Sequence, residues 1–331
     1  MSAEPVIEAR ELRKWYPQRR GALGTLLGRA APAPLKAVDG VSFAVAAGEV
    51  LGLVGESGCG KSTTGMTILK LHEPTSGEIR FQGLGLLAGE DRRTRLAFRR
   101  QAQIVFQNPY EALNPRYTVA QSVREPIAIH FPGSEEAQRE KLVRAMTRAG
   151  LTPVETYLDR YPHQLSGGQL QRIAIARAIS VEPRFLVADE PVSMLDVSIR
   201  AGILNLLRHF ADELDMAVLY ISHDLSTMRH VCSTVAVMYL GQIIEMGPAD
   251  RVLDQPHHPY AQALVAAVPV MGGRTARART LLSGAVPNPS DLPTGCRFHP
   301  RCPKAMARCR ESAPALRTIA PSHQVACHLY D

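Results

Sequence analysis

The sequence of 331 residues is poor in aromatic side chains and lacks any long hydrophobic run. No stretch reaches the ~18 uncharged apolar residues that a membrane-spanning helix needs. The start of the chain, Met1–Pro5, has neither the basic segment nor the apolar segment of a signal peptide. We therefore expect a cytosolic protein, and any membrane pore that it serves must belong to other chains.

Aromatic residues make up only 5% of the chain, although 38 basic and 31 acidic residues give it a net charge of +7. Such a positive charge can indicate nucleic-acid binding, but here basic and acidic residues are interspersed and aromatics are few. We expect no nucleic-acid partner and a general electropositive surface that faces phosphates or anionic lipid. The densest basic run, Arg92–Arg100, is interpreted as a solvated helix face rather than as a membrane or partner contact.

A glycine-rich segment between an apolar strand and a helix is the most informative motif. The predicted strand Val50–Val54 precedes it, and a helical run follows from Thr64. Glycines let backbone N–H groups converge on phosphates, a lysine reaches the β/γ oxygens and a hydroxyl holds Mg²⁺. The segment therefore predicts binding of a nucleoside triphosphate through Gly55, Glu56, Ser57, Gly58, Cys59, Gly60, Lys61, Ser62 and Thr63. Within it, Cys59 is most simply a small filler.

Three further segments place polar residues where an α/β sheet binds ligands. The segment Leu165–Gln169 brings a serine and two glycines to the start of a helical run, which makes either an anion site or an ordinary helix cap. An apolar strand ends in Asp189 and Glu190, and a second strand is followed by His223. Ligands of open α/β sheets bind at the carboxyl ends of the strands. The three segments therefore predict one site with the glycine loop.

In this order, the four motifs resemble the nucleotide-binding subunits of ABC transporters. The resemblance covers nearly the whole chain and extends to the oligopeptide/dipeptide/nickel importer group. The segments similar to that group are Val105–Tyr110, Leu113–Arg116, Tyr161–His163, His258–Tyr260 and Gly295–Pro303. Small departures from the family pattern are Asn108, Ala112 and Met194, where Asp, Ser and Ala are usual.

The resemblance implies an α/β fold, with a P-loop NTPase core of the ABC type. An antiparallel β subdomain and a helical subdomain of about residues 107–173 would belong to an ABC ATPase domain spanning residues 1–255. Residues 256–331 would form a C-terminal extension with a Cys-rich tail.

The resemblance also assigns a role to each motif in hydrolysis of Mg²⁺-bound ATP. Ser62, Gln107 and Asp189 would hold the metal ion, and Gln107 would also contact the nucleotide. Glu190 would polarise the attacking water, while His223 binds the γ-phosphate and Lys61 stabilises developing charge. At the end of the first predicted strand Tyr16, or less closely Trp15, would stack on adenine, with plain packing as the alternative.

The family resemblance further implies that ATP lies between two ATPase subunits. Ser166, Gly167, Gly168 and Gln169 would then act on the partner's nucleotide, and Asp196 would lie at the same interface. Because the importer group commonly pairs two different ATPase chains, we expect a homologous partner, although a homodimer stays open. The other expected partners are two transmembrane permease subunits and, through the complex, an extracytoplasmic substrate-binding protein.

These inferences predict an ATP-hydrolysing motor on the cytoplasmic face of the inner membrane that drives import of di- or oligopeptides. A nickel or other small-solute importer, or a peptide or antibiotic exporter, stays open because other subunits read the substrate. A soluble ATPase acting on ribosomes or DNA is more remote, since the chain has one copy of each motif. The stretch Asn108–Pro126 is expected to meet the permease, with Tyr110, Leu113 and Arg116 as coupling residues.

Four of the six cysteines lie in the tail, with the spacing C-x5-C-x6-C-x17-C. A reducing cytosol disfavours disulfides, and the tail lacks the C-x2-C pairs usual for structural zinc. Four cysteines can complete the shell of a 4Fe-4S cluster, and members of the importer group carry a similar tail. We expect a cluster at Cys296, Cys302, Cys309 and Cys327 that staples residues beyond about Pro287, with zinc or free thiols as alternatives. His299, His323 and His328 are interpreted as surface residues.

Overall fold

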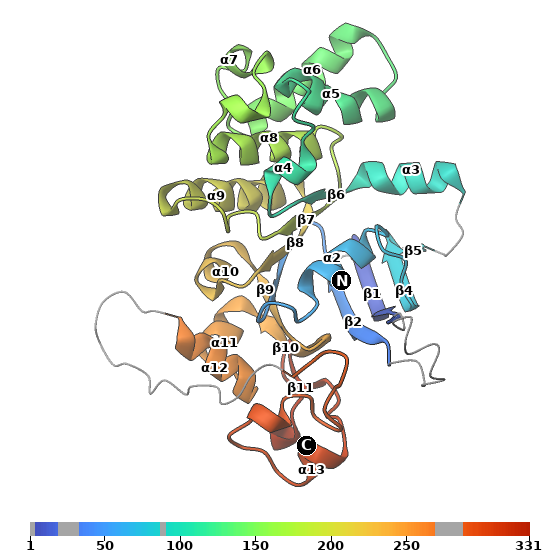
Figure 1. Cartoon of the computed structure of the whole chain (residues 1–331), viewed down its shortest axis with the longest axis vertical. Coiled ribbons are helices and arrows are strands. Elements are labelled where there is room, and N and C mark those ends of the chain that lie inside the picture. The colour runs from blue at the N-terminus through green and yellow to red at the C-terminus, as the bar shows by residue number, and fades with distance from the viewer. Residues whose placement is uncertain (1–3, 19–32, 87–90, 269–286) are drawn as a thin grey trace, which may run out of the picture. The chain divides into compact units, whose positions relative to one another are not determined.

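The computed structural model describes residues 4–18, 33–86, 91–268 and 287–331 (Figure 1). These residues form two compact units. The first comprises the described residues within 4–7, 45–50 and 81–221, and the second comprises those within 8–44, 51–80 and 222–331. Each unit therefore gathers segments that are distant in the sequence.

Three parallel strands run through the first unit, in the order β6 (Ala102–Val105), β7 (Phe185–Asp189) and β8 (Ala217–Ser222). Every residue of β7 and β8 is buried. Strands that are covered on both faces have continuous apolar sequences, and β7 and β8 have such sequences. The register pairs Asp189 with Ile221, so β7 delivers its terminal carboxylate at the carboxyl edge of this sheet.

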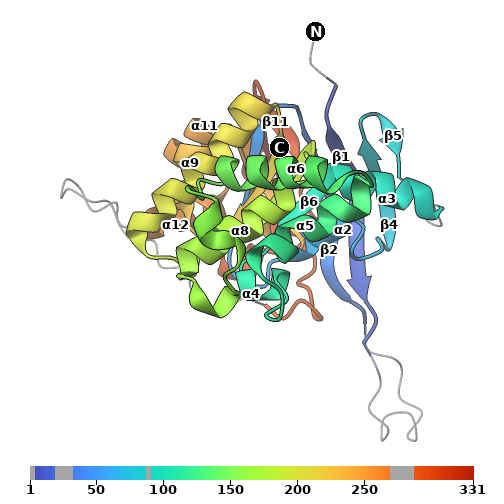
Figure 2. The ribbon, with the colours of Figure 1, turned by 90° about the horizontal axis from the view of Figure 1, so that it is seen from above.

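Helices make up most of the first unit, and α5, α6 and α8 pack against one another (Figure 2). The basic run lies in α3, a helix in which Phe98 is the buried residue, as expected of a largely solvated helix face. That this face makes no membrane or partner contact stays a prediction. The elements are β5 (Leu84–Gly85), α3 (Arg92–Gln101), α4 (Pro109–Ala112), α5 (Val119–His130), α6 (Glu135–Arg148), α7 (Glu155–Leu158), η1 (Pro162–Gln164), α8 (Gly167–Ile179) and α9 (Val197–Leu214).

The second unit contains strands of two sheets. In one, β1 (Ile7–Tyr16) lies between β2 (Leu35–Val45) and β4 (Ser76–Phe81). In the other, β3 (Val50–Val54) runs parallel to β9 (Thr234–Tyr239), and the antiparallel strands β10 (Gln242–Pro248), β12 (His323–Val325) and β11 (Arg317–Ala320) extend this sheet in that order. The C-terminal segment is thus part of the sheet that carries the glycine loop.

The helices of the second unit are short. They are α2 (Lys61–Ile68), α10 (Leu225–Val231), α11 (Ala249–Asp254), α12 (Pro259–Ala267) and α13 (Arg308–Glu311), with 3-10 turns η2 (His299–Arg301) and η3 (His328–Tyr330). The strand, loop and helix predicted around the glycine-rich segment are present as β3, the loop and α2.

A buried aromatic cluster anchors the tail, whose sequence contains few long apolar runs. The ring of Phe298 lies 5.3 Å from that of Tyr239, 5.4 Å from that of Tyr260 and 5.6 Å from that of His258, measured between centroids. All four side chains are buried. One aromatic side chain can bury as much apolar surface as several small ones, so Phe298 compensates for the missing apolar runs.

Candidate functional site

The glycine loop between β3 and α2 is shaped by positions that accept no side chain. Gly58 and Gly60 have φ angles of +79° and +107°, in the left-handed region that favours glycine. A Cβ atom on Gly60 would lie 2.0 Å from the carbonyl oxygen of Ala37, and one on Gly55 would lie 2.2 Å from that of Met238. The backbone therefore approaches its neighbours as closely as a phosphate-binding loop requires.

Lys61 begins α2 and folds back over the loop that precedes it. Its ammonium donates hydrogen bonds to the carbonyl oxygens of Gly55, at 2.8 Å, and Glu56, at 3.0 Å. The side chain is only 5% exposed, so a cation is held inside the loop by backbone dipoles. A buried ammonium beside converging N–H groups makes a site for an anion such as a phosphate.

Cys59 also lies inside the loop, and its thiol is buried. Burial raises the pKa of this thiol, although the ammonium of Lys61, 3.7 Å away, acts in the opposite direction. A thiol with a raised pKa stays protonated at neutral pH and is a poor nucleophile. The environment thus agrees with a small filler and not with a reactive cysteine.

In the first unit, two predicted catalytic residues meet. The amide of Gln107 donates a hydrogen bond to Oε2 of Glu190 at 3.0 Å. Asp189 is buried at the end of β7, and the half-buried Glu190 follows it. These side chains offer amide and carboxylate oxygens, the donors that Mg²⁺ prefers.

His223, the remaining predicted catalytic residue, belongs to the second unit, as the glycine loop does. It is an exposed residue between β8 and α10. The backbone N–H of the next residue, Asp224, donates to the hydroxyl of Ser222 at 3.0 Å, and the Asp224 carboxylate caps α10. The turn that carries the imidazole is therefore fixed on both sides by local hydrogen bonds.

Tyr16 lies at the end of β1 with its ring edge-on to His72, at a centroid distance of 6.0 Å. The neighbouring Trp15 donates a hydrogen bond from its indole to Asp39 at 3.0 Å. An ammonium lies over each ring, that of Lys14 over Tyr16 and that of Lys36 over Trp15. Both rings are half-buried, so the geometry leaves both candidates for adenine stacking in place.

The serine of the LSGGQ segment caps α8 in a reciprocal arrangement. The N–H of Gln169 donates to the hydroxyl of Ser166 at 3.4 Å, and the N–H of Ser166 donates to the side chain of Gln169 at 3.0 Å. The helix-cap interpretation is thus satisfied within this chain.

Ser166, Gly168 and Gln169 also line a cavity of about 330 Å³ together with residues of α9. A Cβ atom on Gly168 would lie 2.8 Å from Ile199.

Asp196 is exposed at the start of α9, beyond the catalytic strand. Its carboxylate makes no capping hydrogen bond to this helix. Two neighbouring apolar side chains are also exposed, Met194 at 65% and Val197 at 79%. Large exposed apolar groups that lie together commonly mark a protein interface.

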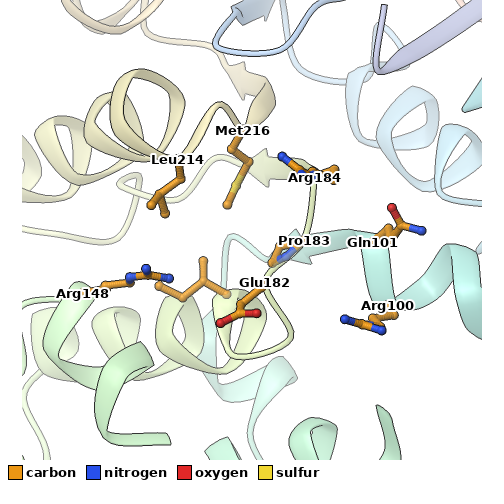
Figure 3. Close-up of a pocket in the computed structure, with 9 residues that line it drawn as sticks. Arg100, Gln101, Arg148, Glu182, Pro183, Arg184, Leu214 and Met216 are labelled. Atoms are coloured by element: carbon orange, nitrogen blue, oxygen red, sulfur yellow. The ribbon is translucent and has the colours of Figure 1, made fainter. Parts of the chain in front are cut away.

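A larger cavity of about 490 Å³ lies in the first unit (Figure 3). Its lining includes Gln101, Arg184 and Met216, the residues directly before β6, β7 and β8. It therefore lies at the amino ends of the parallel strands, whereas Asp189 and Glu190 follow their carboxyl ends. Since ligands of such sheets bind at the carboxyl ends, this cavity is not the nucleotide site.

The four tail cysteines gather as free thiols. The N–H of Cys296 donates to the carbonyl of Cys309 at 2.8 Å. Burial, reinforced by the other three tail thiols, raises the pKa of Cys327 to about 11, although a hydrogen bond with the backbone of Leu329 acts in the opposite direction. In the described ranges, the one group of three or more potential ligands within 4.8 Å of one another is Glu245, His257 and His323.

Two of the three tail histidines are not surface residues, so that interpretation is wrong. His323 is buried with its Nε2 2.8 Å from the carboxylate of Glu245. His328 is buried with its Nδ1 2.6 Å from Asp331 and its Nε2 2.9 Å from the carbonyl of Ser312. Each of these nitrogens already has a partner, so the two imidazoles hold the tail together within this chain.

Sequence reasoning missed two residues that contact the glycine loop. The backbone N–H of Glu56 donates to the hydroxyl of Tyr260 at 2.9 Å, and Arg301 binds the Glu56 carboxylate. The segments that hold Tyr260 and Arg301 were notable only through their resemblance to one group of importers. No local pattern indicates that they meet a residue more than 200 positions earlier.

Within the described ranges, no helix combines the length and apolar character that crossing a bilayer demands.

Comparisons with known proteins agree over the whole chain. Residues 38–193 match the family described as "ABC transporter", and residues 244–309 match "Oligopeptide/dipeptide transporter, C-terminal region". The chain is 45% identical to the oligopeptide transport ATP-binding protein AppF of Bacillus subtilis, over 99% of this chain and 98% of that protein. It is 44% identical to the dipeptide transport ATP-binding protein DppF of Haemophilus influenzae, over 99% and 97%.

Solved structures are similar as well. The chain resembles cbiO1 of Clostridium perfringens, part of the ABC transporter complex cbiONQ, with a TM-score of 0.63 and 28% identity over 76% of this chain and 92% of the other. It resembles the dimeric ABC transporter cassette MJ0796 with a TM-score of 0.63 and 27% identity, over 73% and 98%.

Proposed function

The chain belongs to the ABC transporter family, among its oligopeptide and dipeptide ATP-binding proteins, and we propose from this that it powers import of di- and oligopeptides. Proteins of this family hydrolyse ATP to drive transport, and so does this chain. The observation that carries the peptide assignment is the 44–45% identity over full length to an oligopeptide and a dipeptide transport protein, C-terminal region included.

We propose that the loop Gly55–Thr63 binds the phosphates of ATP, with Lys61 as the cation that faces them and Tyr16 as the stacking partner of adenine. The inward fold of the Lys61 side chain and the close backbone approach at Gly60 support this assignment. When bound, Mg²⁺ neutralises charge on the β- and γ-phosphates. Ser62, Gln107 and Asp189 would hold it, because a hydroxyl, an amide and a carboxylate suit a hard cation.

In the same proposal, Glu190 orients and polarises the attacking water and Gln107 fixes its carboxylate. The 3.0 Å hydrogen bond between them supports this pairing. His223 binds the γ-phosphate and holds the geometry of attack. Catalysis is thus positioning and electrostatic stabilisation without a covalent intermediate.

We further propose that two ATPase subunits enclose the nucleotide, so that Ser166, Gly167, Gly168 and Gln169 act on the partner's ATP, with Asp196 at the interface. The dimeric cassette among similar structures supports this. The second subunit is a homologous chain. The assembly includes two permease subunits on the cytoplasmic face of the inner membrane, and a substrate-binding protein outside. Residues 1–255 form the ATPase domain and 256–331 the extension.

For the tail, we propose that Cys296, Cys302, Cys309 and Cys327 hold a 4Fe-4S cluster that staples the extension. Thiolates suit iron and zinc alike. The absence of C-x2-C pairs, which are usual for structural zinc, favours a cluster over a single zinc ion. Binding iron releases protons from these thiols, because only thiolates ligate.

Replacing Lys61 with Ala tests the nucleotide site. We expect the dissociation constant for ATP, measured with the purified chain by equilibrium binding, to rise at least about tenfold. In the assembled complex, ATP hydrolysis and peptide uptake should be lost together. Lys70→Ala, at the end of the same helical segment, is the control. Unchanged ATP affinity in Lys61→Ala, or ATP-driven transport of a solute other than peptides, would contradict the proposal.

Anaerobic purification tests the cluster. The protein should be brown and contain about four irons and four acid-labile sulfides per chain. Cys302→Ser should lower the iron content, whereas Cys232→Ser, outside the tail, should not. Colourless protein with one zinc per chain would exclude the cluster and leave the ATPase assignment intact.

A further inference from the structure

Glu56 of the phosphate loop is held at two points by the C-terminal extension. Its backbone N–H donates to the hydroxyl of Tyr260 at 2.9 Å. Its carboxylate accepts two hydrogen bonds from the guanidinium of Arg301, at 2.8 Å and 3.0 Å. Parallel bonds of this kind fix the orientation of both groups and are stronger than neutral hydrogen bonds.

The two holding residues are themselves immobilised. Tyr260 is fully buried and Arg301 is 6% exposed, while the Glu56 side chain is 26% exposed. The Nε atom of Arg301 is buried and has no hydrogen-bond partner among the residues that the structure describes. The guanidinium is therefore oriented by its bidentate contact with Glu56, which also raises its pKa. An arginine this enclosed is expensive to bury unless its charge is matched.

The turn that carries Arg301 is fixed to the body of the second unit. Phe298 packs against Tyr239 and Tyr260, and the N–H of Arg301 donates to the carbonyl of Phe298 at 3.0 Å. Arg297 binds Asp39 and the carbonyl of Leu240. The turn thus presents Arg301 from a rigid support, which is what a positioning residue requires.

Holding Glu56 has two consequences for the loop. The carbonyl of Glu56 accepts a hydrogen bond from Lys61, so the peptide that Tyr260 orients also orients the ammonium. The carboxylate lies in a loop that must receive a triphosphate of the same sign, and like charges repel. Arg301 neutralises this carboxylate, so the loop presents a net positive field to the nucleotide.

We propose that Arg301 and Tyr260 are positioning residues for ATP binding, which act through Glu56 and make the C-terminal extension a part of the nucleotide site. The proposal rests on the proposed nucleotide site. It goes beyond that site because it assigns a role in ATP affinity to residues far outside the glycine loop. It also predicts that Glu56 is tolerated in the loop only while its charge is paired.

The test compares Arg301→Met, Tyr260→Phe, Glu56→Gln and the double variant Arg301→Met/Glu56→Gln in the full-length chain. We expect Arg301→Met to raise the dissociation constant for ATP about tenfold and Tyr260→Phe about threefold. In the assembled complex KM should rise with kcat nearly unchanged. The double variant should recover most of the lost affinity, because the unpaired carboxylate is gone.

Arg310→Met removes an exposed arginine of the same extension and serves as the matched control. Equal losses in Arg301→Met and the double variant would indicate a merely structural role and overturn the proposal, as would unchanged affinity in Arg301→Met. If Arg301→Met does not fold, Arg301→Lys keeps one charge and should fall between the wild type and Lys61→Ala. Should Lys61→Ala itself bind ATP normally, the nucleotide site fails and this inference with it.

Discussion

At the scale of single residues, Glu190 combines two features. Its φ of 46° lies in the left-handed region, which is unfavourable for a side chain of this kind, and its N–H donates to the carbonyl of Ile221 at 2.9 Å. Such backbone strain persists only where the surroundings impose it, and it gathers at functional sites. With Gln107 bound to its carboxylate, the side chain is held in one place.

Glu190→Gln should therefore keep ATP binding and lose turnover. The amide preserves shape and hydrogen bonding but cannot accept a proton, so we expect the rate of phosphate release in the assembled complex to fall at least about a hundredfold. ATP affinity should stay within about twofold, and nucleotide-bound dimers should accumulate. Glu213→Gln, an exposed acid of α9, is the control. Hydrolysis at the wild-type rate in Glu190→Gln would remove the base assignment.

The residues that sequence reasoning could not place share one property, which is a partner distant in the sequence. Lys61 and Ser62 were identifiable because their motif is local. His323 was misjudged because its partner, Glu245, is 78 positions away, and Arg301 was overlooked because Glu56 is 245 positions away. A local sequence pattern predicts turns and helices, because both form between neighbouring residues. A buried pair of polar side chains from distant segments forms only once the order of the strands is set.

At the scale of elements, the strand, loop and helix around the glycines follow from pattern alone, and the solved structures confirm the cassette fold. The strands β11 and β12 were not predicted. They contain four and three residues, and they are strands only because β10 offers a partner. Short strands of this kind have too few residues for a period to be visible.

The segment around α4 exposes two of the three residues expected to couple hydrolysis to transport. Leu113, expected as a coupling residue, is buried in this chain and belongs to the core of the first unit. Tyr110 is 58% exposed and Arg116 is exposed as well. Of the three expected coupling residues, Tyr110 and Arg116 are thus the exposed ones, and their coupling role stays a prediction.

We therefore predict that Tyr110→Ala and Arg116→Ala uncouple hydrolysis from uptake. Peptide uptake by the reconstituted complex should fall at least about fivefold, the effect of losing roughly 1 kcal/mol of contact, while ATP affinity stays unchanged. Leu113→Ala should instead lower the melting temperature, because it leaves a cavity. Cross-links that place Tyr110 and Arg116 far from the permease would contradict this assignment.

At the scale of the whole molecule, the exposed apolar pair beside Asp196 is the feature that most needs a partner. Met194 and Val197 bury little in the isolated chain. Covering side chains of this size contributes about 1.5–3 kcal/mol each. A second ATPase subunit at this position would supply that cover.

Met194→Asp and Val197→Asp should accordingly weaken ATP-dependent dimerisation. Measured by size exclusion in the Glu190→Gln background, with the second ATPase subunit present, the dimer should require at least about tenfold more protein. ATP affinity of the single chain should not change. Leu84→Asp alters an equally exposed apolar side chain and is the control. Dimers that form equally well in all three variants would exclude this surface from the interface.

The pairing of β12 with β10 has a consequence for solubility. In the second unit, β12 pairs with the edge of β10. The other edge of β12 pairs with β11, a strand of only four residues with an irregular register. A chain shortened after residue 309, where the matched C-terminal region ends, would leave the N–H and C=O groups of β10 open. An unpaired apolar strand edge recruits other chains. We therefore expect the last 22 residues to protect this protein from self-association, in addition to holding any ligand of its cysteines.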